Sequence, residues 1–201
     1  MCILRGAGPW TSVSGRVTQT IPVLPGVREL AGAYDAAIVD LWGVAHDGHA
    51  PYPGVLDCLA RMRVAGMRLL FLSNAPRRAK RVIHRLSSIG IPRASYDHII
   101  TSGDLTRRAL ARRADPWHAA LGRTYYHLGP ARDWGITRGL DFEETDELVR
   151  ASFILNTGMF DDENETADDY EVFFDRALAA ALPMICVNPD LSVMRGDRRI
   201  P

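Results

Sequence analysis

The chain has 201 residues, which is enough for one ordinary domain or two small ones. Hydrophobic residues make up 47% and charged residues 24%, proportions that exclude a disordered polyelectrolyte and a membrane bundle. The formal net charge is zero, so we expect no nucleic-acid partner, because such partners need a basic excess. Three scattered cysteines, with no signal peptide and no apolar run long enough to span a membrane, favour a cytoplasmic protein without membrane association.

The first half of the chain alternates between short apolar runs and amphipathic segments. Residues 1–20 are predicted to be a loose N-terminal tail. Beyond it we expect strands over 36–39, 67–72 and 97–101, and helices over 53–65, 77–89 and 104–113. This βαβα alternation predicts a parallel sheet with helices on its faces.

The second half repeats the pattern after a connection over 114–121, and we place a domain boundary near residue 116. Strands are predicted over 124–128, 152–155 and 184–187. A helix is predicted over 166–182, with these residues facing inward: Tyr170, Phe173, Phe174, Ala177, Leu178 and Ala181. The sequence therefore predicts a second α/β unit.

Asp40 directly follows the first apolar run. Ligand sites of open parallel sheets gather at the carboxyl ends of the strands, and a carboxylate there can act as a nucleophile or a metal ligand. A turn-forming Asp that caps a loop explains the same position. Both interpretations are open on position alone.

Ser73 and Asn74 end the second apolar run in the same way, so we expect them beside Asp40. A hydroxyl and free backbone N–H groups ahead of a helix form an anion site. A plain helix N-cap is the alternative, because both residue types favour it. The pairing with Asp40 favours a phosphate site.

Five segments, in this order, resemble the haloacid dehalogenase-like (HAD) hydrolases, and among them the NagD-like subgroup: YDAAIVDLWGV (34–44), HDG (46–48), PG (53–54), LSN (72–74) and TSGD (101–104). The resemblance runs from about residue 21 to the end of the chain. It implies an α/β fold with a Rossmann-like parallel-sheet core over 21–115 and an inserted α/β cap over 116–201.

The resemblance also implies an Mg²⁺-dependent phosphatase that acts on a small phosphorylated metabolite. Asp40 would be the nucleophile that forms an aspartyl-phosphate. Mg²⁺ would bind the Asp40 carboxylate and the backbone carbonyl of Trp42. Ser73 would hold the phosphate, and we expect Asn74 and Arg77 to assist because they follow Ser73 closely.

Three features depart from the family pattern. Trp42 stands where the family usually has a second Asp that acts as general acid and base, so His46 and Asp47 are candidates to replace it. The family's lysine after the cap has no counterpart, because Lys80 is the only lysine and precedes the cap.

The family's last aspartate motif also has no full counterpart, so we expect an incomplete core that stops before the third and fourth motifs. An unpaired sheet edge in such a core would favour a homodimer. The alternatives to a working phosphatase are a catalytically impaired phosphate-binding module and a non-functional fragment of a longer hydrolase.

Overall fold

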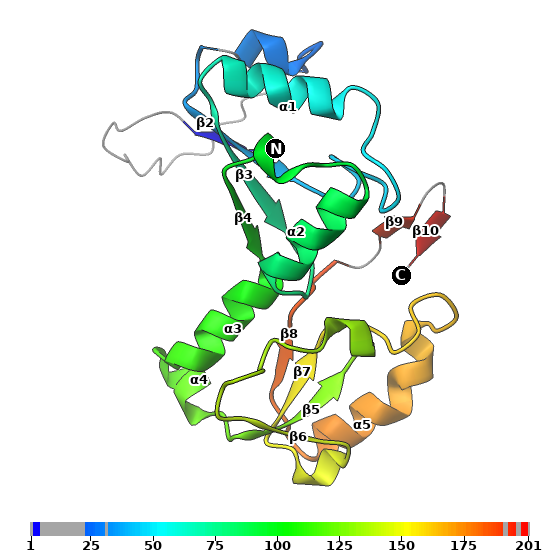
Figure 1. Ribbon diagram of the computed structural model, residues 1–201. Coiled ribbons are helices and arrows are strands. Elements are labelled where there is room, and N and C mark those ends of the chain that lie inside the picture. Colours follow the sequence, from blue (N-terminus) through cyan, green and yellow to red (C-terminus); the bar gives the residue numbers. More distant parts are fainter. Residues whose placement is uncertain (1, 5–22, 31, 191–192, 196–197, 201) are drawn as a thin grey trace.

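The computed structural model describes residues 2–4, 23–30, 32–190, 193–195 and 198–200. These residues form two α/β units, one above the other in Figure 1, and helix α3 (Ser102–Arg112) runs from the first unit to the second. Each unit is built on its own sheet, so the predicted α/β class is confirmed. Within the described residues, no helix has the length and apolar character needed to cross a membrane.

The first unit contains three parallel strands in the order in which they occur in the chain. The strands are β2 (Ala36–Asp40), β3 (Arg68–Ser73) and β4 (His98–Thr101). The helices are α1 (Val55–Val64), α2 (Ala79–Ser88) and the 3₁₀ helices η1 (Val27–Leu30) and η2 (Arg93–Ser95). The predictions of strands and helices for residues 36–113 are therefore confirmed to within a few residues.

An additional strand, β1 (Cys2–Leu4), pairs antiparallel with β2. The sequence did not predict this strand, because it lies within the segment expected to be a loose tail. The remainder of that predicted tail, residue 1 and residues 5–20, lies outside the described residues.

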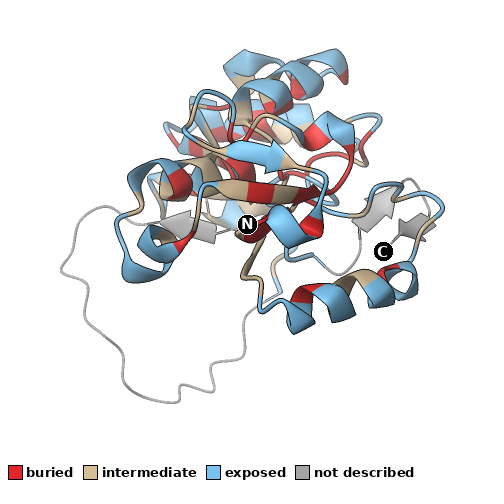
Figure 2. Ribbon diagram, turned by 90° about the horizontal axis from the view of Figure 1, so that it is seen from below, coloured by how far each residue is buried: buried red, intermediate tan, exposed pale blue. Residues whose placement is uncertain are grey.

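The core of the first unit lies between the sheet and its helices. Leu69 and Phe71 of β3 are fully buried, and the Phe71 ring stacks on Tyr96 with centroids 4.4 Å apart. Helices α1 and α2 contribute these buried residues: Leu59, Met62, Val82 and Leu86. Figure 2 shows buried residues along the strands and on the inward faces of the helices, as expected for helices that cover a sheet.

The second unit has a four-stranded parallel sheet in the order β6-β5-β7-β8. The strands are β5 (Thr124–Leu128), β6 (Glu143–Thr145), β7 (Phe153–Asn156) and β8 (Met184–Cys186). The helices are α4 (Pro116–Ala120), α5 (Glu171–Ala179), η3 (Ala131–Asp133), η4 (Leu148–Arg150) and η5 (Ala167–Tyr170). Beyond β8, β9 (Val193–Arg195) pairs antiparallel with β10 (Arg198–Ile200).

Two predictions for the second unit need correction. The prediction of inward positions for Leu178 and Ala181 is wrong, because both are exposed. Leu178 is turned about 100° around α5 from the buried Ala177 and is exposed, and Ala181 lies beyond the end of the helix with a positive φ of 50°. The segment predicted as a connection over 114–121 contains α4, where Pro116 occupies the first turn and Asp115 caps the helix.

The second sheet is covered on both faces. One face packs with Leu110 and Leu121, and the other with Tyr170 and Ala177. Leu110 belongs to α3, so the packing changes from the first unit to the second within α3, before the predicted boundary near residue 116.

Candidate active site

The ends of the three parallel strands meet at one edge of the first sheet. Across the ladder, Asp40 is paired with Leu72, and Ser73 is paired with Thr101. Polar side chains from three strands are thus gathered at the carboxyl edge, where parallel sheets bind ligands. The structure places Asp40 and Ser73 on neighbouring strand ends, as the sequence predicts.

The Asp40 side chain is exposed, and its Oδ1 accepts a hydrogen bond of 2.8 Å from the backbone N–H of Leu41. Leu41 is buried, and its carbonyl accepts bonds from the N–H groups of Val44, Ala45 and His46. A compact turn therefore follows β2 and presents the Asp40 carboxylate at the surface.

Trp42 lies two residues after Asp40 and is 36% exposed. Its ring meets the His46 ring edge-on, with centroids 5.5 Å apart. A Cβ at Gly48 would lie 2.8 Å from the Trp42 ring, and Gly48 has a φ of 95°. Glycine is therefore required at position 48, and Trp42 forms part of the packing of this turn.

His46 is buried, and its Nδ1 accepts a hydrogen bond of 2.9 Å from the backbone N–H of Gly48. The neutral ring then carries its proton on Nε2. Burial lowers the pKa of His46, Arg85 adds to this effect, and Asp47 and Asp40 oppose it. His46 is therefore a neutral N–H donor at physiological pH.

Asp47 caps the same turn. Its Oδ1 accepts from the N–H groups of Ala50 and His49 at 2.8 Å each, and these backbone bonds lower the pKa of Asp47. The group is thus stabilised as a carboxylate, which does not suit it to the predicted role of replacement acid.

Ser73 is buried at the end of β3, and its Oγ accepts a hydrogen bond of 3.2 Å from the N–H of Ala75. The loop from Ser73 to α2 is held from outside by two residues. Thr101 Oγ1 donates to the Arg77 carbonyl at 2.6 Å, and Asp104 Oδ2 accepts from the Ala79 N–H at 2.9 Å. The position of the loop is thus set by the start of α3.

The segment Thr101–Asp104 also fits tightly against this loop. A Cβ at Gly103 would lie 2.6 Å from the backbone of Arg77, so no larger residue fits without a shift. The Asp104 carboxylate forms an ion pair with Arg78. The sequence identified this segment as part of the resemblance but assigned it no role; the Gly-Asp pair after a strand was the available signal.

Asn74 and Arg77 bind residues far away in the sequence. Asn74 Nδ2 donates to Asp190 Oδ1 at 2.8 Å, and Arg77 Nε donates to the Asp133 carboxylate. Asp133 is only 3% exposed, so this ion pair is largely withdrawn from water. Both predicted phosphate ligands therefore connect the first unit to the second part of the chain.

Two further arginines hold the bridging loop, which we define as residues 130–138 between β5 and β6. Arg81 Nη1 of α2 donates to the carbonyl of Arg132 at 2.6 Å. Arg107 Nη1 of α3 donates to the carbonyls of Ile136 and Arg138 at 2.9 and 2.7 Å. The bridging loop is thus bonded to two helices at successive points.

The predicted metal ligands are an exposed carboxylate, from Asp40, and a main-chain carbonyl, from Trp42. Both are oxygen donors of the kind that Mg²⁺ prefers, and Mg²⁺ usually takes only one or two carboxylates and fills its shell with water and phosphate oxygens. The pair fits a partial protein ligand set of this kind. Across the described ranges, no group of three or more His, Cys, Asp or Glu side chains could hold a metal ion.

Comparison with protein families gave a match over more than half of the chain. The family described as haloacid dehalogenase-like hydrolase matches residues 37–143, which include Asp40, Ser73 and the segment Thr101–Asp104. A search of curated proteins gave no significant match.

Solved structures with the same fold include a hydrolase of the haloacid dehalogenase-like family from Brucella suis, 37% identical with a TM-score of 0.78. Alignment covers 89% of this chain and 65% of that one. The glycerol phosphate phosphatase from Mycobacterium tuberculosis, solved with magnesium, is 20% identical with a TM-score of 0.61. That alignment covers 86% of this chain and 49% of the phosphatase. A structure described as a nagD protein is 17% identical with a TM-score of 0.61, with coverage of 83% and 61%. This chain thus spans about half to two thirds of the length of these proteins.

Proposed function

Because the chain belongs to the haloacid dehalogenase-like hydrolase family and has a NagD-like fold, we propose that it hydrolyses the phosphate monoester of a small metabolite. One observation carries the proposal: Asp40 is presented at the carboxyl edge of the first sheet, on the strand next to the one that ends in Ser73. A nucleophile and a phosphate-binding hydroxyl at adjacent strand ends suit a phosphoryl transfer.

In the proposed reaction, a carboxylate oxygen of Asp40 attacks phosphorus while the bond from phosphorus to the ester oxygen breaks. The leaving alkoxide takes up a proton and departs as an alcohol. Water then attacks phosphorus, the bond to the Asp40 oxygen breaks, and inorganic phosphate leaves with the carboxylate restored.

Ser73 is the residue that we assign to the phosphate, together with the backbone N–H groups of the loop before α2. Support comes from the contacts of Thr101 and Asp104, which hold this loop in place before any ligand binds. Asn74 and Arg77 take a linking role instead, because their donors are directed to Asp190 and Asp133. Mg²⁺ bound by Asp40 and the Trp42 carbonyl would offset the repulsion between the carboxylate and the phosphate.

The proton for the leaving group needs a donor other than Trp42. Neither predicted replacement is a strong acid at neutral pH: His46 is a neutral ring that holds its Nε2 proton firmly, and backbone hydrogen bonds stabilise the Asp47 carboxylate. General acid–base catalysis contributes about 10²–10⁴-fold to a rate, so a poorly placed donor would leave a slow enzyme.

Trp42 favours a second candidate function. A side chain without a transferable proton at this position suits a module that binds phosphate esters without turnover. In that case Ser73 and its loop would still bind the ligand, and Asp40 would only coordinate the metal.

The test is phosphate release from a panel of small phosphate esters, measured with Mg²⁺ and with EDTA. Asp40→Asn should abolish release, since the amide is a poor nucleophile. Asp57→Asn is the matched control, because Asp57 is an exposed carboxylate on α1 that forms an ion pair with Arg61, and it should leave release unchanged. Equal turnover by the Asp40 variant would refute the mechanism, and saturable ester binding without turnover by the unaltered chain would select the binding module.

A further inference from the structure

The second sheet changes the direction of its connections between β5 and β7. In the order β6-β5-β7-β8, the chain leaves β5 towards β6 on one side and leaves β7 towards β8 on the other. Open α/β sheets form a crevice at such a point, between the loops that diverge from the carboxyl ends of the two strands. A ligand site is therefore expected at this edge of the second sheet as well as at the edge that carries Asp40.

A cavity of about 550 Å³ lies there. Trp134, from the loop after β5, and Phe160, from the loop after β7, both line it, as does Tyr126 of β5. Trp134 is 57% exposed and Phe160 46% exposed, although large aromatic residues are usually covered. The cavity thus has an aromatic wall that is accessible to a ligand.

The charge of the lining is negative. Glu144 and Asp146 contribute carboxylates, and among the residues that the structure describes no Lys or Arg side chain lines the cavity. His127 also lines it but is neutral, because its Nδ1 accepts the Trp134 indole N–H at 2.6 Å and burial lowers its pKa. A cavity lined by both carboxylates and aromatic rings favours a cation, through charge pairing and cation–π attraction.

Several of these groups are fixed before a ligand arrives. The bond to His127 orients the Trp134 ring, and His127 Nε2 lies 2.8 Å from Thr157 Oγ1. Glu144 accepts a hydrogen bond of 2.8 Å from the Tyr125 hydroxyl. Within the described residues Asp146 forms no ion pair, so its charge is available. A preorganised site loses less entropy when it binds its ligand.

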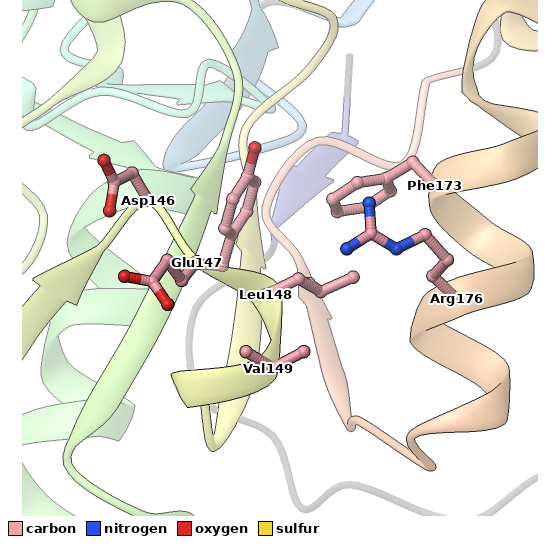
Figure 3. A pocket seen from close by; sticks show the side chains of 7 residues that line it. Asp146, Glu147, Leu148, Val149, Phe173 and Arg176 are labelled. Carbon is pink, nitrogen blue, oxygen red and sulfur yellow. The ribbon is translucent and has the colours of Figure 1, made fainter.

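An adjoining pocket differs in chemistry. It shares Tyr126 and Asp146 with the first cavity, but Arg176 also lines it, and Figure 3 shows this guanidinium beside Phe173, across from Asp146 and Glu147. A cation in the adjoining pocket would meet the positive charge of Arg176. The cavity beside Trp134 is therefore the better site for a cation.

We propose that the cavity between Trp134, Phe160 and Asp146 binds an organic cation, an alkylammonium group whose charge faces the carboxylates and whose methyl groups lie against the aromatic rings. This inference does not rest on the proposed hydrolase function. It adds a second ligand site at the carboxyl edge of the second sheet.

The test is calorimetric titration of the chain with choline and with 3,3-dimethyl-1-butanol, a neutral compound of the same shape. Choline should bind at one saturable site, and the neutral compound should bind about tenfold more weakly or not at all. Equal binding of the two compounds, or no saturable binding of choline, would overturn the proposal.

Matched variants locate the site. Asp146→Asn should weaken choline binding about tenfold, and Trp134→Leu should weaken it at least as much. Glu147→Gln is the control. It also removes one negative charge, at the residue next to Asp146, but the Glu147 side chain lines the adjoining pocket and not the cavity beside Trp134. Equal losses in the Asp146 and Glu147 variants would show a general charge effect and contradict the assignment. Circular dichroism spectra of each variant establish that it is folded.

Discussion

The two sheets of the molecule run their strands in parallel, and both collect polar side chains at their carboxyl edges, yet they use these side chains differently. At the first edge, Asp40 is exposed, and the Ser73 hydroxyl accepts a hydrogen bond from the Ala75 N–H within its own loop. At the second edge, both ring nitrogens of His127 have partners, in Trp134 and Thr157. The ring nitrogens of His127 thus stabilise the loops at the second edge, and it is the exposed carboxylates, Asp40 at the first edge and Asp146 at the second, that are left for ligands.

The largest expected effect compares the two hydrophobic cores. Phe71 and Phe153 are both fully buried, one in each sheet. Replacing either by Ala should lower the free energy of unfolding by about 3–5 kcal/mol. Helix α3 begins at the carboxyl edge of the first sheet and contributes Leu110 to the core of the second unit. We therefore expect urea unfolding to show one transition in both variants. Two separate transitions would show that the units unfold independently.

The next effect concerns the ion pair that joins the units. Asp133→Ala leaves the Arg77 guanidinium without its partner, and Arg77 is 32% exposed, so we expect the low end of the cost for breaking a buried pair, about 3 kcal/mol. Asp57→Ala removes an exposed pair with Arg61 and should change stability little. Urea unfolding measures both, and equal effects would mean that the Arg77–Asp133 pair does not hold the units together.

The third prediction concerns the pH dependence of stability that His127 causes at the carboxyl edge of the second sheet. Burial lowers the pKa of His127, so the unfolded chain binds a proton more readily than the folded one. Stability should therefore be complete above the unfolded pKa of about 6.5 and should decline as the pH falls below it. His127→Phe should reduce this decline. The pH dependence of stability that remains in this variant includes the contribution of His46, because its pKa is also lowered in the folded chain. An unchanged pH dependence of urea unfolding in the variant would contradict this account.

The smallest effects compare two buried tyrosines. The Tyr96 hydroxyl has no hydrogen-bond partner among the described residues, so Tyr96→Phe should be neutral or should stabilise by up to about 1 kcal/mol. Tyr125 bonds to Thr137 and Glu144, so Tyr125→Phe should cost about 1–2 kcal/mol. Thermal unfolding measures the difference, and a cost of equal size at both positions would show that Tyr96 has a partner.

The sequence predicted what depends on nearby residues. Asp40 and Ser73 were located because a strand ends where its apolar run ends, and parallel strands share an edge. Asn74 and Arg77 are predicted to bind phosphate because they follow Ser73 closely, whereas the residues that they bond, Asp190 and Asp133, lie 116 and 56 residues further along the chain. No local pattern reports such pairs.

Short elements with little apolar character were also missed. Strand β6 covers only Glu143–Thr145, and two of its three residues are acidic, so no apolar run marks it. It forms only through its ladder with β5, which is a tertiary contact. The longer apolar runs of the sequence therefore predict six strands, whereas the three-residue strands β1, β6, β9 and β10 were not predicted.

The composition has a practical consequence at helix α2. Lys80 is the only lysine of the chain, and its side chain is exposed on α2, one residue before Arg81, which holds the bridging loop. Lys80 therefore offers the only side-chain amine of this sequence to an amine-reactive dye. A fluorophore attached to Lys80 would lie on α2, which follows the loop of Ser73 and contacts the bridging loop of the second unit through Arg81. It would report movement between the two units without an engineered cysteine.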